Sequence, residues 1–191
     1  EAGLRAVFGD DRVLGAMTME GAAMPEPGTV HHMLSAVTYL GERSGPVTGR
    51  VRRLAALLEQ GGLPAAAVEE VAGAVWTKFV QSCAASGVCG VTRRGYAPAT
   101  ATPAGADLYV RLVREGLAVM GAEGFEPGDY LGDAASLRAV GEAADPAEAA
   151  ALVRRTAERL IAAGYVGGTS LLRDLEARKA GKVRHIGFTG H

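Results

Sequence analysis

The sequence has few aromatic residues and no excess of charge of either sign. Aromatic residues make up 5% of the 191 residues, so the core must be aliphatic and rich in alanine, which favours closely packed helices. The 20 Lys and Arg residues against 21 Asp and Glu leave a net charge of −1, which argues against a nucleic-acid-binding protein. With 48% hydrophobic and 21% charged residues, the composition is that of a soluble globular protein. The length fits one domain, or one domain plus part of another.

Cysteine is also scarce, and long apolar runs are missing. Cys83 and Cys89 are the two cysteines, a number that excludes a disulfide scaffold and favours a reducing compartment. Their spacing fits neither a zinc site nor a thioredoxin-type motif, and we expect no metal. No apolar stretch approaches the roughly 20 residues that cross a bilayer. We therefore expect a cytoplasmic protein that has neither a membrane nor a nucleic acid as its partner.

The common nucleotide-binding and hydrolase motifs are missing as well. The sequence contains no G-x-G-x-x-G, no G-x-x-x-x-G-K-[ST], no H-E-x-x-H and no G-x-S-x-G. Nothing in it therefore predicts a pyrophosphate bound at a helix N-terminus. Glycine is nevertheless abundant, at 27 of 191 residues, and we attribute the excess to turns and helix ends.

The first forty residues have the pattern of short strands and turns. Residues 1–8 carry apolar side chains at helical spacing, as the last turns of a helix would. Three β-compatible runs come next, at residues 12–19, 29–33 and 36–40, and their close spacing predicts an antiparallel meander or a sheet edge. A glycine- and proline-containing stretch at residues 41–46 is the predicted boundary between this β-rich segment and the rest of the chain.

From residue 47 onward the pattern is helical. An apolar stripe predicts a helix over residues 47–58, and Pro64 is placed to open the next one, whose stripe comprises Val68, Val71, Ala72, Val75, Phe79 and Cys83. Residues 87–103 have the composition of a loop, and residues 104–123 are helical again. Asp145-Pro146-Ala147-Glu148 is a strong helix start, and that helix ends near Gly164. A final helix is predicted from Ser170 to Lys179. The predicted fold class is mostly α, an all-helical domain preceded by a β-rich segment.

Lys78 is the first candidate for chemistry. It lies about 80° from the centre of the predicted apolar stripe, where its stem can pack while its ammonium reaches a cleft. Ser82 lies one turn later and points into the same space. A lysine so placed can stabilise negative charge on a substrate oxygen. The alternative is a surface lysine whose stem lies along the helix.

Ser170 and Asp174 form a second pair, again one turn apart on a predicted helix. A hydroxyl and a carboxylate at this spacing can bind the hydroxyl or carboxylate groups of a substrate. The alternative is that Ser170, after Gly167-Gly168-Thr169, caps the helix. His31 and His32 are adjacent in a strand and face opposite sides, so they are not expected to bind one metal together.

Taken in order, four segments resemble the C-terminal half of the ketopantoate reductase (2-dehydropantoate 2-reductase) family. The first is residues 8–15, FGDDRVLG, and the second combines PGTVHH at 27–32 with LGE at 40–42. The third, Trp76-Thr77-Lys78-Phe79, resembles the segment that carries the catalytic lysine. The fourth, TSLLRDLEA at 169–177, resembles a late helix of the family. The order and spacing of the four make the resemblance more specific than any one of them.

The resemblance implies a two-domain oxidoreductase. A Rossmann-type NADPH-binding domain would precede a helical domain similar to that of 6-phosphogluconate dehydrogenase, with the active site in the cleft between them. The enzyme would reduce a 2-oxo acid such as 2-dehydropantoate to the 2-hydroxy acid on the pantothenate pathway, as a homodimer. Residues 1–44 would be the end of the NADPH-binding domain, residues 45–180 the substrate and dimerisation domain, and residues 181–191 an atypical tail.

The resemblance also implies roles for the candidate residues. Lys78 would polarise the ketone and stabilise the incipient alkoxide. Ser170 would bind the substrate, with Asp174 as a supporting polar residue nearby. Ser82 stands where the family has an asparagine, which is consistent with a different 2-oxo acid as substrate. The NADPH site would be formed by residues upstream of Glu1, because the chain starts without an initiator Met and without the glycine-rich unit.

Two features depart from the family pattern. Lys182 stands where a glutamate is expected, which weakens the case for acid assistance from that position. The last residues, 176–191, resemble a helix-to-strand step of aldo-keto reductases, but residues 47–165 do not have the repeating βα pattern of that barrel. The competing interpretation is a catalytically inert helical module that dimerises and has no cofactor domain of its own.

Overall fold

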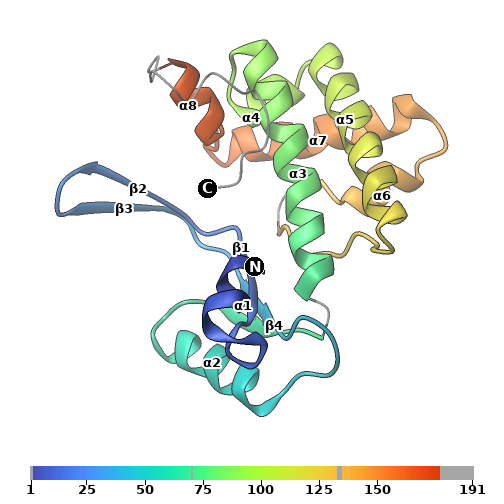
Figure 1. Ribbon diagram of the computed structural model, residues 1–191. Coiled ribbons are helices and arrows are strands. Elements are labelled where there is room, and N and C mark those ends of the chain that lie inside the picture. Colours follow the sequence, from blue (N-terminus) through green and yellow to red (C-terminus); the bar gives the residue numbers. More distant parts are fainter. Residues whose placement is uncertain (1, 70, 133–134, 177–191) are drawn as a thin grey trace. The chain divides into compact units, whose positions relative to one another are not determined.

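A computed structural model describes residues 2–69, 71–132 and 135–176 (Figure 1). Most of the described residues are helical, and the strands lie in the first part of the chain, so the predicted mostly α fold class is confirmed. The chain divides into two compact units, Glu1–Lys78 and Phe79–His191. This division falls inside a long helix, α3 (Val71–Thr92), rather than in the glycine- and proline-containing stretch at 41–46.

The first unit is built around a small sheet. It begins with α1 (Ala2–Phe8) and the 3₁₀ turn η1 (Asp10–Arg12), followed by β1 (Gly15–Thr18), β2 (Gly21–Glu26), β3 (Thr29–Leu34) and β4 (Thr38–Gly41). After α2 (Gly49–Gln60) comes β5 (Ala65–Ala67). The sheet has the order β1-β4-β5, with β1 antiparallel and β5 parallel to β4. The three strands expected from the sequence are therefore present as β1, β3 and β4, and β2 is an addition.

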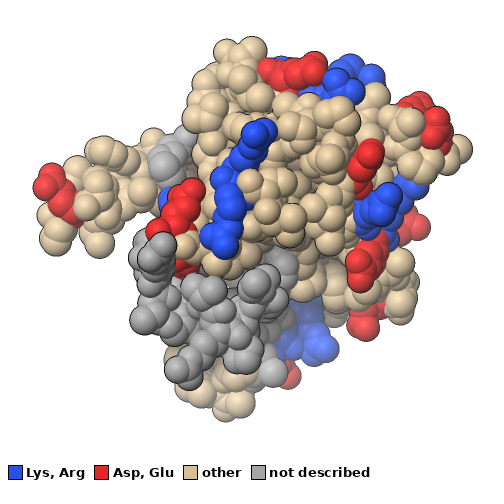
Figure 2. All heavy atoms as spheres, turned by 90° about the horizontal axis from the view of Figure 1, so that it is seen from above, with Lys and Arg blue, Asp and Glu red and all other residues tan. Residues whose placement is uncertain are grey.

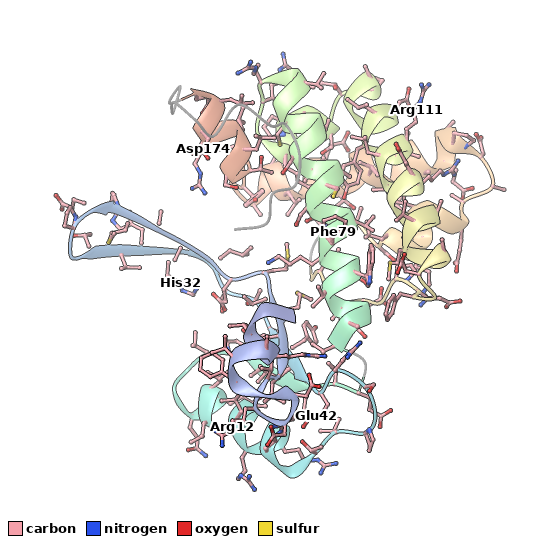
Figure 3. The ribbon with its side chains drawn as sticks, viewed as in Figure 1. Arg12, His32, Glu42, Phe79, Arg111 and Asp174 are labelled. Carbon is pink, nitrogen blue, oxygen red and sulfur yellow. The ribbon has the colours of Figure 1, made fainter. Side chains whose placement is uncertain are left out.

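β2 and β3 form a separate two-stranded hairpin (Figure 1). Because β2 follows β1 and β3 precedes β4, the hairpin continues the β1–β4 pair outward. The side chain of Glu20 joins the two pairs at their junction. Its Oε1 accepts the backbone N–H of Ala36 at 2.8 Å, and its Oε2 lies 2.5 Å from Nε2 of His32, which Figure 3 labels. These contacts hold the pKa of the Glu20 carboxyl below its ordinary value, with the Ala36 hydrogen bond as the largest cause.

The core of the first unit lies between the sheet and α2. Its buried residues are Leu40, Val51, Ala55 and Ala65, with Leu14, Val47, Leu58 and Ala67 packed against them. Thr48 caps α2, its hydroxyl oxygen accepting the N–H of Val51. On the predicted apolar stripe of residues 47–58, Val51 and Ala55 are buried as expected, whereas Leu54 is exposed.

The segment after α2 differs from the prediction. Pro64 was expected to open a helix, but it precedes β5, and α3 begins at Val71. The carbonyl of Pro64 accepts the N–H of Thr38 at 2.8 Å, and the N–H of Val68 donates to the carbonyl of Leu40 at 2.8 Å. Three alanines have no strand-forming side-chain pattern, so this strand depends on its pairing with β4.

The second unit is helical in its described residues. It comprises the rest of α3, then α4 (Tyr96–Thr100), α5 (Pro103–Ala122), α6 (Leu137–Glu142), α7 (Pro146–Ala162) and α8 (Ser170–Glu176) (Figure 1). The predicted start of α7 is confirmed: Asp145 is the N-cap and accepts the N–H of Ala147 at 2.8 Å, with Pro146 as the first helical residue. None of the described helices is both long enough and apolar enough to span a membrane.

Small residues bring the helices of this unit close together. A Cβ atom at Gly87 of α3 would lie 2.8 Å from the Leu112 side chain of α5, and one at Gly116 of α5 would lie 2.9 Å from that of Val80. Alanines make up much of the buried interior around the larger Tyr109, Met120 and Leu137. This is the alanine-rich helical core that the scarcity of aromatic residues predicted.

Two further expectations were wrong. Residues 87–103 are not a loop, because α3 continues to Thr92 and α4 begins at Tyr96, with Arg93 at φ 55° between them. The stripe predicted to be buried is correct at Val71, but Val75 and Phe79 are 39% and 44% exposed, whereas Ala74, Val80, Ala84 and Val88 are buried. Both errors arise because α3 carries apolar residues on two faces and glycines that serve helix packing.

Of the final predicted helix, Ser170–Glu176 is helical. The remaining residues, 177–191, which include Lys182 and the predicted tail, lie outside the described residues.

Candidate functional site

Lys78 lies in the middle of α3 and is half-buried. It is the last residue of the first unit. The helix is firmly formed at this point: the neighbouring Thr77 is fully buried and its hydroxyl donates to the carbonyl of Gly73 at 2.7 Å. Val75 and Phe79, which flank Lys78 on the predicted stripe, are exposed, whereas Thr77 and Val80 beside them are buried.

The face of α3 that carries Lys78 is apolar and open. At 100° per residue, Val75, Lys78, Phe79 and Ser82 all lie within about 100° of one another around the helix. Val75 and Phe79 are 39% and 44% exposed, and Lys78 and Ser82 are half-buried. Figure 3 shows Phe79 on this helix. We call these four residues the α3 face. A helix that is hydrophobic all round is usually buried, so the α3 face has the composition of a surface that something covers.

Ser82 has a neighbour that sequence reasoning missed. The Ser82 hydroxyl donates to the side-chain oxygen of Gln81 at a long distance of 3.5 Å. Gln81 is only 8% exposed, so it is one of the few polar side chains buried on α3. Gln81 lies three residues after Lys78, and this helical spacing could have identified it from the sequence.

Ser170 and Asp174 lie on α8, a helix of seven residues. Thr169, the residue before the helix, makes the capping bonds: its hydroxyl oxygen accepts the N–H of Leu172 at 3.4 Å, and its carbonyl accepts the N–H of Arg173 at 3.2 Å. The alternative interpretation of Ser170 as the N-cap is therefore wrong. The Ser170 side chain is exposed and Asp174, labelled in Figure 3, is half-buried one turn later.

The two cysteines are free thiols with little reactivity. Burial raises the pKa of the Cys83 thiol to about 11. Burial also raises the pKa of Cys89, and hydrogen bonds from the backbone and side chain of Thr169 partly offset that rise. Because the thiolate is the nucleophilic form, a raised pKa argues against either cysteine as a nucleophile at neutral pH.

The surface offers no concentrated charge on the face that Figure 2 presents, where basic and acidic side chains lie interspersed. Within the described part of the chain, no three His, Cys, Asp or Glu residues come together in a way that could hold a metal ion. His31 and His32 pair with Ala23 and Ala22 across the hairpin. The candidate chemistry therefore rests on a lysine, two serines and an aspartate.

The helices bring these residues together in two pairs. α3 places Lys78 and Ser82 one turn apart, and α8 does the same for Ser170 and Asp174. Within the second unit, α3 and α8 lie against each other, since a Cβ atom at Gly90 would lie 3.7 Å from Leu171 and 3.9 Å from Leu175. Lys78 and Ser82 offer a cation and a hydroxyl, groups suited to a carbonyl or carboxylate substrate, and Ser170 and Asp174 offer a hydroxyl and a carboxylate.

Comparison with known proteins gives a family match. Residues 70–187 match the family described as ketopantoate reductase PanE/ApbA, C terminal. This match covers all the described residues of α3 and α8 and reaches into the 181–191 tail.

Individual proteins are similar over most of this chain. The chain is 27% identical over 175 residues, 92% of its length, to a 2-dehydropantoate 2-reductase of Archaeoglobus fulgidus, of which it covers 51%. Its structure resembles that of a 2-dehydropantoate 2-reductase from Geobacter metallireducens, with a TM-score of 0.68, 21% identity, and coverage of 93% of this chain and 52% of the other. It also resembles a D-mandelate dehydrogenase solved with NADH and anilino(oxo)acetate, with a TM-score of 0.66, 18% identity, and coverage of 91% and 50%. The chain thus spans about half the length of these relatives.

Proposed function

The chain belongs to the ketopantoate reductase family, as its motifs predicted, and from that premise we propose that it is part of an NADPH-dependent oxidoreductase. The proposed reaction reduces a 2-oxo acid such as 2-dehydropantoate to the 2-hydroxy acid. The relatives named 2-dehydropantoate 2-reductase support the substrate class, and the dehydrogenase solved with NADH supports a nicotinamide cofactor. The cytoplasmic location and the place on the pantothenate pathway remain predictions.

The observation that carries the proposal is the α3 face. It presents a lysine and a serine between exposed apolar side chains, on a helix that is otherwise packed on its opposite side. A substrate carbonyl beside Lys78 would accept a hydrogen bond from its ammonium group. As the carbonyl carbon is reduced, negative charge develops on the oxygen, and Lys78 would stabilise that charge and supply the proton of the new hydroxyl.

Ser170 would bind the substrate from α8, with Asp174 as a supporting polar group. This assignment gains support from the capping geometry, because Thr169 satisfies the helix end and leaves the Ser170 hydroxyl exposed. Ser82 would contact the substrate one turn after Lys78, where the family has an asparagine. The serine side chain is shorter than that of asparagine and offers one hydrogen-bond donor rather than two. The space it leaves would favour a bulkier 2-oxo acid.

The described residues do not fit a dinucleotide. The sequence lacks the glycine-rich G-x-G-x-x-G turn, so the described helices provide no cradle for a pyrophosphate in the usual manner. We therefore assign the hydride donor to residues other than 1–191, and interpret residues 1–44 as the end of its domain. Residues 45–180 would form the substrate and dimerisation domain, and residues 181–191 a tail.

One observation favours a second function, that of a helical module that dimerises without catalysis. Several apolar side chains of the second unit are exposed, among them Val91 at 75%, Val119 at 52% and Val166 at 60%. Apolar side chains of this kind can form a subunit interface. Homodimer formation is also compatible with the oxidoreductase, so the two proposals differ in catalysis alone.

A chimeric enzyme tests the proposed function. Residues 1–191 would replace the matching half of the Archaeoglobus fulgidus 2-dehydropantoate 2-reductase, and NADPH oxidation with 2-dehydropantoate would be followed by absorbance. Changing Lys78→Ala should lower kcat by at least a hundredfold, since one lost donor to a developing oxyanion typically costs about 10²–10³ in rate. Arg52→Ala, an exposed cation on α2, serves as the matched control and should leave kcat unchanged. If the Lys78→Ala chimera had the same kcat as the unchanged chimera, the role assigned to Lys78 would be wrong.

A further inference from the structure

The short helix α8 cannot hold its position by itself. It has seven residues, and isolated helices shorter than about 12 residues are marginal in water. Its place in the fold, and with it the place of Ser170 and Asp174, must therefore come from contacts with the rest of the second unit. Three sets of contacts provide it, and two of them meet at the N-terminal end of α8.

The first set of contacts is made by Thr169. Its hydroxyl oxygen accepts the N–H of Leu172 at 3.4 Å and its carbonyl accepts the N–H of Arg173 at 3.2 Å, so this residue starts the helix. Its backbone and side chain also lie close enough to the thiol of Cys89 to lower the pKa of that thiol. Cys89 is fully buried within α3, so Thr169 ties the start of α8 to the interior of the second unit.

The second set of contacts fixes the chain that leads into α8. The N–H of Tyr165 donates to the carbonyl of Leu160 at 2.9 Å, and the N–H of Tyr96 donates to the carbonyl of Gly167 at 3.0 Å. Gly95 lies directly against this segment: a Cβ atom there would be 2.1 Å from the carbonyl oxygen of Val166. The approach is so close that only glycine fits.

The third set of contacts orients α8 along its length. Leu172 is buried, and Leu171 and Leu175 lie over Gly90 of α3. Leu171 and Leu175 therefore face α3, whereas Ser170, at another angle around the helix, is exposed and Asp174 is half-buried. A two-turn helix held at its start and along one side can present these two groups in a defined direction.

We propose that Thr169 is a positioning residue for the substrate: by capping α8, it sets where the Ser170 hydroxyl meets a 2-oxo acid. This inference rests on the proposed function for the identity of the ligand. Thr169 touches no substrate itself and acts through Ser170. Because Thr169 supplies the cap, Ser170 keeps its hydroxyl for binding. Without the cap, the first turn would lose its defined geometry and the hydroxyl its direction.

The test compares Thr169→Val with Thr169→Ser in the 191-residue chain. Valine has nearly the same shape but no hydroxyl, whereas serine retains the cap. Hydrogen exchange should show the amides of Leu172 and Arg173 at least tenfold faster in Thr169→Val and unchanged in Thr169→Ser, with the α5 and α7 amides alike in all variants. Calorimetry should show 2-dehydropantoate binding at least tenfold weaker in Thr169→Val and restored in Thr169→Ser. A valine variant that behaves as the wild type in either measurement overturns the proposal.

A double-mutant cycle separates positioning from a general loss of structure. In a Ser170→Ala background, Thr169→Val should weaken 2-dehydropantoate binding no further, because Thr169 acts through the missing hydroxyl. Additive losses would mean that Thr169 does not act through Ser170 and would overturn the proposal. If the wild-type chain binds no 2-oxo acid, the proposed function fails for this chain, and with it the link to substrate, while the exchange data still decide whether Thr169 holds α8.

Discussion

At the scale of single residues, glycine allows the helices and loops of this molecule to pack closely. Gly87, Gly95 and Gly116 each lie where a Cβ atom would come within 3 Å of a neighbour. Gly95 differs from the other two because its neighbour is a backbone carbonyl, which cannot rotate away as a leucine side chain can. The abundance of glycine in the sequence is thus explained by close packing as well as by turns.

Gly95→Ala should therefore destabilise the protein by about 1–3 kcal/mol, the usual cost of forcing extra volume into a packed site. The added Cβ would lie 2.1 Å from the carbonyl oxygen of Val166 and would push the segment before α8 outward. Gly90→Ala is the matched control, because its Cβ would meet only Leu171 and Leu175 at 3.7 and 3.9 Å, and alanine favours a helix by about 0.5–1 kcal/mol. Urea unfolding measures both changes, and a Gly95→Ala protein as stable as the wild type would contradict the role of this close contact.

The candidate site shows what can be predicted for individual residues. The spacing of Lys78 and Ser82 follows from the helical pattern alone, and the structure retains it. The pattern could not decide between Ser170 and Thr169 as the cap, because both are good capping residues after two glycines. That choice depends on where α8 begins relative to Cys89, a contact between residues eighty positions apart, which no local pattern contains.

At the scale of secondary-structure elements, helices with one apolar face were predictable and those with two were not. The start of α7 follows from Asp145, Pro146 and Glu148, whose capping chemistry is local. α3 has apolar residues all round, so periodicity selected a stripe on which Val71 is buried but Val75 and Phe79 are exposed. β5 is three alanines, and its identity as a strand comes from its partner β4.

The join between β4 and α2 depends on an ion pair. The carboxylate of Glu42 accepts bonds from Nε of Arg50 at 2.8 Å and from the hydroxyl of Thr48 at 2.6 Å, with a second guanidinium bond at 2.5 Å. The arginine first, and then the threonine, lower the pKa of Glu42 from 4.5 to about 2. Figure 3 shows Glu42 in the first unit, where it links the end of the strand to the first turn of the helix.

This ion pair predicts a pH dependence of stability. A carboxyl whose pKa is lower in the folded protein stabilises it fully above the unfolded value of about 4.5, and the stabilisation is lost as pH falls through about 2. Glu42→Gln should lower the free energy of unfolding by about 1 kcal/mol at pH 7, a modest value because Arg50 is partly exposed and its charge is screened. The difference should shrink between pH 4.5 and pH 2.

Urea unfolding across that pH range measures the effect. Glu59→Gln, which removes an exposed carboxylate of α2, is the control and should change stability by less than about 0.5 kcal/mol. A Glu42→Gln protein whose stability differs from the wild type by the same amount at pH 7 and pH 2.5 would refute the role of this carboxylate.

At the scale of the whole molecule, the chain spans about half the length of its relatives and matches the C-terminal part of the ketopantoate reductase family. In the proposed enzyme, α3 and α8 carry the side chains that contact the substrate, and other residues bind the dinucleotide. We therefore predict that the 191-residue chain does not bind NADPH with micromolar affinity, because it lacks a glycine-rich phosphate-binding turn.

Calorimetric titration of the chain with NADPH checks this prediction, with the complete Archaeoglobus fulgidus enzyme as the positive control. Heat of binding should be seen for the complete enzyme and not for the chain. A dissociation constant in the micromolar range for the chain would mean that residues 1–191 hold the cofactor in a manner that no recognised motif indicates.

The tip of the β2–β3 hairpin is a suitable place to attach a label to the molecule. At its tip Gly28 has φ 88° and no atom within 4 Å of its side-chain position, and most side chains of both strands are exposed. Exposed loop tips of this kind tolerate insertions, since the strands' own register is anchored at the other end by Glu20. An epitope tag, a fluorophore or a spin label introduced after Pro27 would therefore report on the protein from a point remote in sequence from both α3 and α8.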